Sequence, residues 1–457
     1  MGIRLDWEIE AEKERVKSSR EDPEAVRNRR RTQRRFLLLI VFLLFIAGLI
    51  IGGTVLRLEY VDSVVEQGLR SAVEAEIAAL RVGDRDAFLR SQRSATSDWE
   101  NLQSTIFDTY QDLKLTTDLN LTGQILDVVI EGQRGRVIVQ EIINDAPFAR
   151  VWFYWRYEEG WFHVPPDYTF WGDVVTLDES RYSIRYQSVD APFATAIAES
   201  FDVWFTLGCT VIDCSSLPKI TVDIHPNSPA DPAWSSLNEW QLVLTSPFVQ
   251  PVRMDQVLNP NTKMQIATLM AERLVNFETN QLEPLYPADV FYLKSAIVSW
   301  LVGQFTNTQT NSFFIASIAD QLTPARVGNV LRAFTPTTNV SELSPVLGVA
   351  NIAEANVDWR DFLTWRLRLE QDFLASRDRD AFFALYDGAN PTSLAVADSR
   401  FNAGSMVTPQ VVVSAAAPVQ RDGSIFLNVL VQVGEGENRQ QIETTFRWDG
   451  FGWKRWD

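Results

Sequence analysis

The longest uninterrupted apolar run of the chain lies near its start, at Phe36–Leu56, where 21 residues carry no charged side chain. As a helix this run is about 31 Å long, enough to cross the roughly 30 Å hydrocarbon core of a bilayer. Six arginines in Arg27–Arg35 precede it and only Arg57 follows closely, so the positive-inside rule places residues 1–35 in the cytoplasm. The pattern predicts one retained transmembrane helix at 36–56, because the run and its charged leader are both longer than in a typical cleaved signal peptide.

Helical periodicity then occurs twice around the same short motif, far apart in the chain. The two segments are "VEAEIAALRVGDRDAFLRSQ" at Val73–Gln92 and "LRLEQDFLASRDRDAFFALYD" at Leu367–Asp387. Each predicts a helix, a short polar break and a second helix that begins at "DRDAF". Asp84 and Asp378 are the predicted N-caps of these second helices, and the Asp two positions later suits the positive end of the helix dipole. The motif therefore indicates the start of a duplicated fold rather than two active sites.

Alternating patterns later in each copy predict strands. The segments "RVWFYWRYEEGWFHV" at Arg150–Val164 and "QIETTFRWDGFGWKRW" at Gln441–Trp456 both alternate, turn at Glu-Gly or Asp-Gly, and resume with Gly-Trp. We expect each copy to hold two or more helices followed by an antiparallel sheet of about four strands. We align Trp155 with Phe446 and Tyr157 with Trp448. The period of two then predicts that these four aromatic side chains lie on the inner faces of the sheets.

This order of helices, "DRDAF" motif, strands and a final Gly-Trp strand resembles the nuclear transport factor 2-like superfamily, which includes polyketide-cyclase-like (SnoaL-like) and ketosteroid-isomerase-like proteins. The resemblance implies two cone-shaped α+β domains, each with a curled antiparallel sheet, at 57–180 and 351–457. More members of the superfamily serve in binding or dimerisation than in catalysis, and its enzymes place acid–base residues inside the cone. Because Trp, Tyr and Phe occupy the predicted inner positions, the resemblance implies non-catalytic cones and allows a homodimer.

Between the two copies, the pattern of residues 181–350 predicts an α+β domain that is mostly helical. A strand, a helix containing "LMAERLVNF" and a second buried helix follow one another in an order that resembles gluzincin-type metallopeptidases. In that family the first helix carries His-Glu-x-x-His and the next supplies a glutamate, whose place Ser299 or a neighbour takes here. The five motif positions read Ala271, Glu272, Arg273, Leu274 and Val275. The resemblance implies a peptidase-like domain without its zinc ligands, since Glu272 alone cannot hold the ion, and an unrelated α+β domain is the alternative.

The charge of the chain narrows the classes of partner. Its net charge is −17, and Met1–Arg35 has 11 basic and 8 acidic residues, which leaves 31 basic and 51 acidic residues in the rest. This acidic remainder of the chain repels nucleic-acid backbones, because proteins bind such backbones through clustered Lys and Arg side chains. The basic arm orients the span and suits anionic lipid headgroups. We therefore expect the lipid bilayer as a partner through 36–56, and no nucleic acid.

The two cysteines, Cys209 and Cys214, lie in the segment "LGCTVIDCSS". The sequence pattern predicts that this segment is a loop between an apolar helix and a strand. Outside the cytoplasm a local disulfide is the expected state of such a pair. A thiol metal site needs further ligands, and only His225 is near in the sequence.

No pattern indicates a catalytic centre. The only histidines are His163 and His225, neither in a nucleophile motif, and there is no glycine-rich phosphate loop. We expect no catalytic, cofactor-binding or metal-ligating residue and no cofactor. The expected function is a membrane-anchored, extracytoplasmic binding or scaffold protein that recognises a protein, peptide or small ligand at the cell surface. The alternative is an isomerase or cyclase-like enzyme that uses the interior of one cone, with Tyr110, Asp108 or His163 as acid–base groups.

Overall fold

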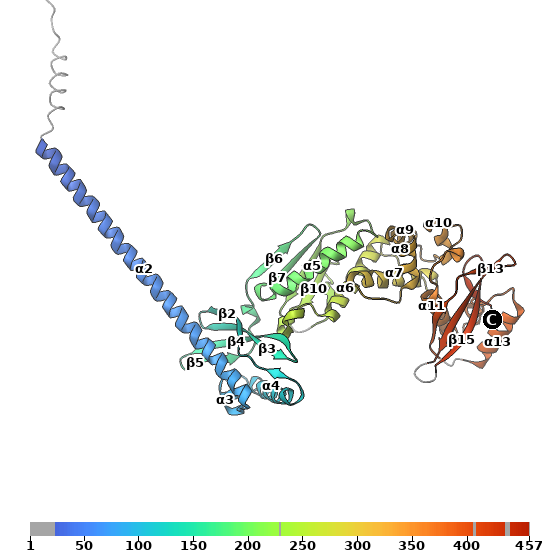
Figure 1. The fold of residues 1–457 in the computed structure, drawn as a ribbon, viewed down its shortest axis with the longest axis horizontal. Helices are drawn as coiled ribbons and strands as arrows, with labels where there is room; N and C mark the ends of the chain where they lie inside the picture. Colours follow the sequence, from blue (N-terminus) through green and yellow to red (C-terminus); the bar gives the residue numbers. More distant parts are fainter. Residues whose placement is uncertain (1–22, 228–229, 405–407, 435–438, 457) are drawn as a thin grey trace, which may run out of the picture. The chain divides into compact units, whose positions relative to one another are not determined.

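The computed structural model describes residues 23–227, 230–404, 408–434 and 439–456 (Figure 1). Across these residues the chain is mixed α and β, and it includes a curled antiparallel half-barrel sheet. The chain forms two compact units: the first holds the described residues up to 116 with 125–137 and 152–165, and the second holds the remainder. Strands β3 (Arg134–Ile143) and β4 (Ala146–Tyr157) contribute residues to both units.

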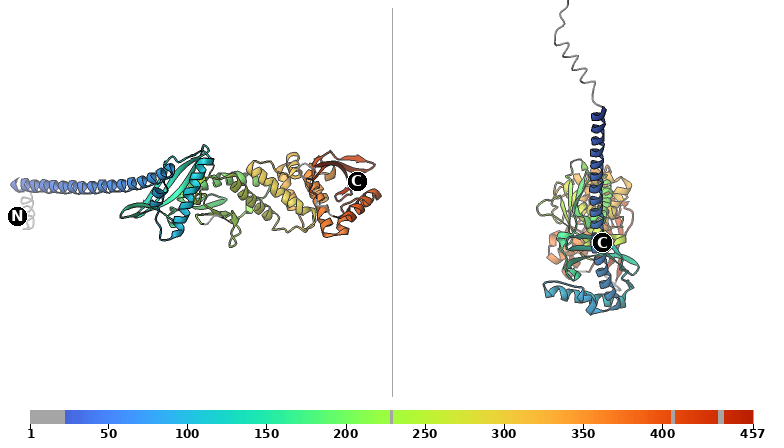
Figure 2. Two further views of the ribbon diagram at one scale, coloured as in Figure 1. Left: turned by 90° about the horizontal axis from the view of Figure 1, so that it is seen from below. Right: turned by 90° about the vertical axis from the view of Figure 1, so that its left-hand side faces the viewer.

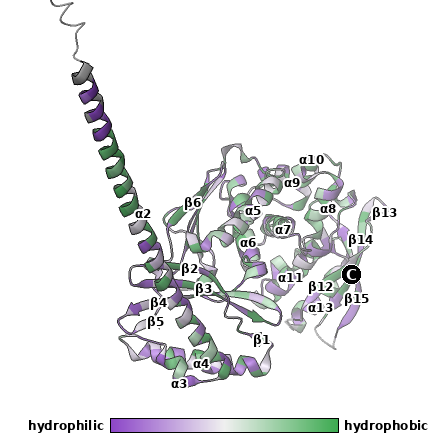
Figure 3. Ribbon diagram, turned by 60° about the vertical axis from the view of Figure 1, so that its left-hand side comes forward, coloured by the Kyte–Doolittle hydropathy of each residue, from purple (hydrophilic) through white to green (hydrophobic). Residues whose placement is uncertain are grey.

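The first unit begins with α2 (Pro23–Val82), one continuous helix of 60 residues (Figure 2, left). The helix is long and apolar enough to cross a membrane, and Figure 3 shows its apolar stretch as a green band. Farther along, side chains three or four positions apart form a buried stripe, as in an amphipathic helix. The stripe consists of Leu69, Val73, Ile77 and Leu80. The predicted span and the first helix of the first copy are therefore parts of the same helix, with no break between them.

Two helices and two strands complete the first unit: α3 (Arg85–Arg90), α4 (Ser97–Thr116), β2 (Ile125–Glu131) and β5 (Gly160–Val164). Strand β5 pairs antiparallel with the part of β4 that belongs to this unit. Asp84 is the N-cap of α3, and its Oδ1 accepts a hydrogen bond from the Ala87 backbone N–H at 2.9 Å. The predicted cap of the first copy is thus confirmed.

The second unit contains a mixed sheet in the order β6-β7-β8-β10-β9. Its strands are β6 (Val174–Asp178), β7 (Tyr182–Gln187), β8 (Ile220–His225), β9 (Ala233–Trp234) and β10 (Gln241–Thr245). Helix α5 (Ala191–Gly208) connects β7 to its parallel neighbour β8. The predicted boundary at residue 180 is wrong at this point, because it separates β6 from β7 although the two strands pair. Two short strands of the unit, β1 (Leu119–Asn120) and β11 (Val252–Arg253), pair with its parts of β3 and β4.

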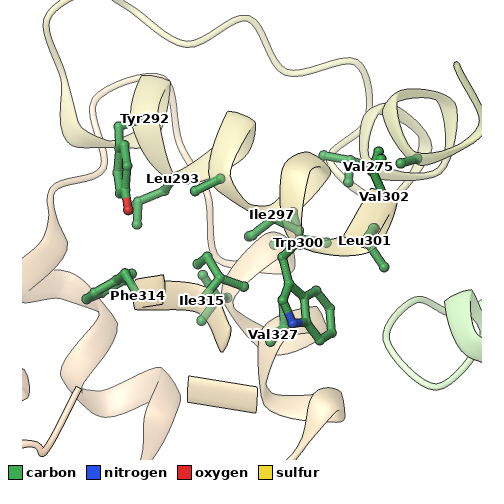
Figure 4. Close-up of a cluster of buried hydrophobic side chains, with 14 of the residues drawn as sticks. Val275, Tyr292, Leu293, Ile297, Trp300, Leu301, Val302, Phe314, Ile315 and Val327 are labelled. Atoms are coloured by element: carbon green, nitrogen blue, oxygen red, sulfur yellow. The ribbon is translucent and has the colours of Figure 1, made fainter. Parts of the chain in front are cut away.

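Five helices follow this sheet: α6 (Pro260–Glu278), α7 (Asp289–Thr306), α8 (Phe313–Gln321), α9 (Pro324–Arg332) and α10 (Leu343–Leu347). Helix α7 is the central one, since its residues are buried around most of its circumference. Figure 4 shows Ile297 and Trp300 of α7 beside Ile315 of α8 and Val327 of α9. These close apolar contacts hold the helices of the region together.

The last elements are α11 (Arg360–Ser376), α12 (Arg379–Phe383), α13 (Pro391–Ala403), β12 (Gln410–Ala415), β13 (Val419–Arg421), β14 (Ser424–Val433), β15 (Gln440–Trp448) and β16 (Trp453–Arg455). The strands form an antiparallel sheet in the order β12-β14-β15-β16, with β13 also paired to β14. Asp378 caps α12 by accepting from the Ala381 N–H at 3.0 Å, which confirms the second predicted cap. One hydrophobic core extends from Tyr182 to Trp453, so the predicted boundary at 350 does not separate two cores.

Candidate ligand site

A pocket of about 440 Å³ lies beside α11 in the second unit. Its walls come from α7, the segment that leads into α8, α11 and β12, and thus from residues far apart in the sequence. Pockets of this size hold small ligands when a few polar groups converge on an otherwise apolar wall. The polar residues around this pocket include Tyr292, Ser295, Ser299, Arg360, Asp361 and Arg368.

Asp361, in the first turn of α11, brings a carboxyl group to the pocket wall. Its Oδ1 accepts a hydrogen bond from the Phe314 N–H at 3.0 Å, and the Tyr292 hydroxyl is a further donor to the same carboxyl, whose Oδ2 is buried. Burial raises the pKa of this carboxyl to about 6, although the nearby Tyr292 hydroxyl and backbone N–H groups oppose the rise. An acid with this pKa changes its charge close to neutral pH.

The Tyr292 hydroxyl is the second buried polar group of the pocket. Its side chain is 7% exposed, and its hydroxyl is a hydrogen-bond donor to the Asp361 carboxyl. Burial and the neighbouring Asp361 carboxyl raise the pKa of this hydroxyl, so Tyr292 stays a neutral donor. The Tyr292 hydroxyl and the Asp361 carboxyl therefore form a buried polar pair at the pocket wall.

Arg368 supplies a positive charge at the other end of the same helix face. It lies seven positions after Asp361, two turns along α11, which corresponds to about 10.5 Å. Its side chain is exposed, and its charge acts on the Tyr286 hydroxyl, which donates to Oδ2 of Asp372 at 2.6 Å. Arg360 differs, because its guanidinium binds both oxygens of Asp358 and stacks over the Phe313 ring.

Aromatic and aliphatic side chains form the rest of the pocket wall. Trp365 lies between the two charged positions on α11 and stacks on Tyr292, with ring centroids 5.5 Å apart. Phe291 and Val411 line the pocket and remain exposed. The exposed edge of the pocket is therefore formed by apolar side chains, and Arg368 supplies a positive charge beside them.

A second kind of polar cluster, inside each copy of the repeat, centres on a buried glutamate. In the first copy Glu76 is 1% exposed, and its carboxylate meets the Tyr154 hydroxyl at 2.7 Å, Nδ1 of His163 at 2.7 Å and Nε2 of Gln92 at 2.8 Å. Rings of Tyr154, Trp152 and Trp99 surround the His163 imidazole. Burial beside Glu76 raises the pKa of the Tyr154 hydroxyl.

In the second copy Glu370, which is 3% exposed, occupies the equivalent position. It accepts from the Tyr386 hydroxyl and pairs with Nη1 of Arg400 at 2.6 Å and with Nη1 of Arg455 at 3.2 Å. Backbone bridges join Gln92 to His163 and Tyr386 to Arg455, so the two clusters are built alike. The sequence patterns did not lead us to predict Glu76 or Glu370, although each lies eight positions before the capping Asp of its "DRDAF" motif.

The strand register corrects the predicted alignment of the two copies. Tyr154 pairs with His163, and Phe446 pairs with Arg455, so Tyr154 and not Trp155 corresponds to Phe446. Trp155 is 36% exposed, and Tyr157 is half-buried beneath the Arg93 guanidinium. The inward placement of Trp155 and Tyr157 is therefore wrong, because a slip of one residue exchanges the two faces of a strand.

The second-copy aromatics Phe446 and Trp448 are buried, in agreement with their predicted inward direction. Trp448 packs against Trp453 and Trp359, so it is part of the core.

The remaining predicted residues take separate places. A disulfide joins Cys209 and Cys214. In α6, Ala271 and Val275 are fully buried and Glu272 is exposed, and the described residues contain no group of three or more His, Cys, Asp or Glu side chains that could hold a metal ion.

Among the three predicted acid–base residues, His163 contacts the buried acid Glu76. Asp108 is exposed in an ion pair with Arg85, and Tyr110 is buried on α4.

Comparison with known proteins gives no relative from which a function could be transferred. No protein-family model matches the chain, and neither a curated protein nor a solved structure matches it. The candidate site therefore stands on its geometry alone.

Proposed function

We propose that this protein is a single-pass, membrane-anchored binding protein whose bulk lies outside the cytoplasm and binds a small ligand in the pocket between α7, α8, α11 and β12. The observation that carries the proposal is the pocket of about 440 Å³, whose wall combines the apolar side chains of Phe291, Trp365 and Val411 with the cationic Arg368. Pockets of this size that combine a mostly apolar wall with a few polar groups are typical of small-ligand sites.

The membrane part of the proposal is supported by α2. Its apolar side chains between 36 and 56 are almost all exposed, which is unfavourable in water and favourable in a bilayer. The excess of arginines before this stretch favours a cytoplasmic N-terminus. The two cone domains and the peptidase-like middle domain remain part of this proposal as its expected architecture, and the cones also suit a homodimer.

Native mass spectrometry of the full-length protein, released from its membrane in a mild detergent, tests the proposal. We expect a bound small molecule that Ser295→Trp removes, because Ser295 lines the pocket from an exposed position of α7 and an indole there fills it. Ser71→Trp, at an exposed position of α2, is the matched control and keeps the ligand. A protein without any bound small molecule, or a mass shift that survives Ser295→Trp, contradicts the proposal.

An enzyme is the second candidate, and the Asp361 carboxyl is the observation that favours it. A buried acid with a pKa of about 6 in an open pocket is suited to general acid–base catalysis. In this case Asp361→Asn abolishes turnover of the bound molecule, which mass spectrometry detects as a ligand that no longer converts to product. If the ligand released from the wild-type protein is chemically unchanged after prolonged incubation, the enzyme is excluded and the binding protein stands.

A further inference from the structure

The mixed sheet of the second unit ends at an edge strand of five residues, β6 (Figure 1). The sheet has the order β6-β7-β8-β10-β9, so one side of β6 pairs with β7 and its other side meets no strand of the described chain. The opposite edge, β9, is only two residues long. Very short edge strands resist pairing with other chains, whereas longer ones can take up a further strand. Strand β6 is therefore the edge at which this sheet can be extended.

The main-chain groups of alternate β6 residues point away from the sheet. Before the strand, the Ser188 N–H donates to the Asp173 carbonyl at 2.9 Å, and after it the Glu179 N–H donates to a carbonyl of β7 at 2.9 Å. Odd-numbered residues of β6 therefore turn their N–H and C=O groups toward β7, and even-numbered residues turn theirs outward. The outward residues are Val174, Thr176 and Asp178. No hydrogen bond within the described residues reaches their main-chain groups, which form a row that a further strand can pair with.

Strand β6 also lacks the devices that commonly block an edge strand. It contains no Pro, Gly or Lys, and Val174 and Val175 are 65% and 37% exposed. The edge strand β12 differs, because its ladder is irregular between Val412 and Ser414 and the Thr364 hydroxyl accepts from the Val412 N–H. An exposed edge of β-branched residues without such protection is a typical site of pairing with another chain.

The side chains of β6 match those of a second, antiparallel copy of the same strand. With a two-fold axis at Val175, this residue lies opposite its own copy, and Val174 lies opposite Thr176. Pairs of β-branched residues are favourable neighbours across strands. The flanking acid Asp173 comes to lie opposite Leu177 and thus meets no like charge.

Charge favours this register over the next one. The outward groups also pair when the axis lies one residue later, but Asp173 is then opposite Glu179 of the second copy. Like charges directly opposite each other are destabilising. In the first register Asp178 faces no acid of the second copy, and in each copy Lys219 pairs with it at 2.6 Å. The strand is thus complementary to itself in main-chain hydrogen bonds, side-chain type and charge.

We propose that β6 pairs antiparallel with β6 of a second copy of this chain, about a two-fold axis at Val175, so that the two five-stranded sheets continue as one. The contact is isologous, because each copy contributes the same strand. It uses no residue of the pocket beside α11, so it goes beyond the proposed function and does not depend on it. Because one strand pair buries less than the roughly 1,200 Å² of a stable interface, we expect dilution to shift the dimer toward monomers.

Disulfide cross-linking of the full-length protein in native membranes tests the contact and its register. Opposite residues without main-chain hydrogen bonds between them have Cα atoms about 4.5 Å apart, which suits a disulfide. We therefore expect mild oxidation to link Val175→Cys into a dimer that a reductant separates. Thr176→Cys should link at least about tenfold more slowly, because residue 176 and its copy lie diagonally, about 7–8 Å apart. Val203→Cys, at an exposed position of α5, is the control and stays unlinked.

Two further substitutions test whether the outward groups of β6 hold the dimer. Thr176→Pro removes an N–H that points away from β7, so it leaves the pairing of β6 with β7 in place. Val175→Lys places two ammonium groups opposite each other. Each variant should raise the dissociation constant of the dimer at least about tenfold, as measured by light scattering of a concentration series in detergent. Far-UV circular dichroism should stay unchanged, and Ser295→Trp, in the pocket, should not alter the dissociation constant.

The results separate this inference from the proposed function. Cross-linking of Thr176→Cys as fast as that of Val175→Cys overturns the register and with it the inference. A dimer that both Thr176→Pro and Val175→Lys leave intact has its contact elsewhere, for example in the cones, and overturns the inference as well. So does a Val175→Cys product that contains a different protein. If no dimer forms in membranes or in detergent while a ligand occupies the pocket, the inference fails and the proposed binding function stands.

Discussion

At the scale of single residues, Asp361 makes the stability of the fold depend on pH. Burial raises the pKa of its carboxyl from 3.8 to about 6, so the folded state holds this proton more tightly than the unfolded state does. The corresponding free energy is roughly 3 kcal/mol, which disfavours the ionised form in the folded protein. This contribution to stability is fully present below about pH 4 and is lost as the pH rises through about 6.

Replacing Asp361 by Asn removes the ionisation while its side-chain oxygen can still accept the Phe314 N–H. We expect Asp361→Asn to raise the free energy of unfolding by about 1–3 kcal/mol at pH 8 and to leave it nearly unchanged at pH 4, where the wild-type carboxyl is protonated. Guanidinium titrations followed by tryptophan fluorescence at both pH values measure the difference. Asp320→Asn, at an exposed position of α8, is the control and should change neither value. An equal effect of Asp361→Asn at the two pH values would contradict this account.

The two buried glutamates differ in the charges around them, and this predicts unequal costs of neutralisation. Glu370→Gln removes the negative charge shared by Arg400 and Arg455, so we expect it to lower the free energy of unfolding by about 2–4 kcal/mol. Glu76→Gln keeps an acceptor for Tyr154 and removes no arginine's counterion, so the expected loss is about 1–2 kcal/mol. Denaturant unfolding of the two variants at pH 7 compares them directly. A larger loss for Glu76→Gln than for Glu370→Gln is the outcome that this explanation cannot accommodate.

These residues also show which parts of a site can be read from sequence. Glu76 and Glu370 share a fixed distance from Asp84 and Asp378, so the repeat itself contained the signal. The alignment of Trp155 with Phe446 failed because hairpin register depends on which residues pair across the turn, and a one-residue error reverses the face. Asp361 could not be identified, because its raised pKa results from burial by α7 and α8, far from it in the sequence.

At the scale of elements, the "DRDAF" motif is a local signal that works the same way in both copies. Asp84 and Asp378 each accept a hydrogen bond from the backbone N–H three residues later, at 2.9 and 3.0 Å. Local patterns of this kind are predictable, because capping depends on neighbouring residues only. The order and direction of β7, β8 and β10 are not local, and the parallel pairing of these strands was not predicted from the sequence.

Capping by these two aspartates predicts a modest and matched effect of mutation. Asp84→Ala and Asp378→Ala should each lower the free energy of unfolding by about 1 kcal/mol, because each leaves a helix N–H without its acceptor. Urea denaturation of each variant provides the measurement. Asp84→Asn and Asp378→Asn are the controls, since Asn is an equally good N-cap and should restore most of the stability. If the Asn variants lose as much as the Ala variants, the effect belongs to charge rather than to capping.

At the scale of the whole chain, α2 links a predicted span to a folded part without a flexible connection. Leu69, the first residue of the buried stripe, lies 13 positions beyond Leu56, about 20 Å along the same helix. If 36–56 crosses the bilayer, the rigid helix keeps this stripe at a fixed distance from the membrane surface. Such a connection was only partly predictable, since the apolar run and the amphipathic stripe were recognised as separate helices.

The orientation of α2 in the membrane determines on which side of the membrane the pocket meets its ligand. The arginines before residue 36 favour a cytoplasmic N-terminus, so we expect residue 28 inside the cell and residue 94 outside. The chain has two cysteines, and they are joined to each other, so a single introduced cysteine provides the only free thiol. A membrane-impermeant maleimide applied to intact cells should label Ser94→Cys and leave Asn28→Cys unlabelled until the membrane is permeabilised. Labelling of Asn28→Cys in intact cells would reverse the orientation, and the pocket beside α11 would then face cytoplasmic rather than external ligands.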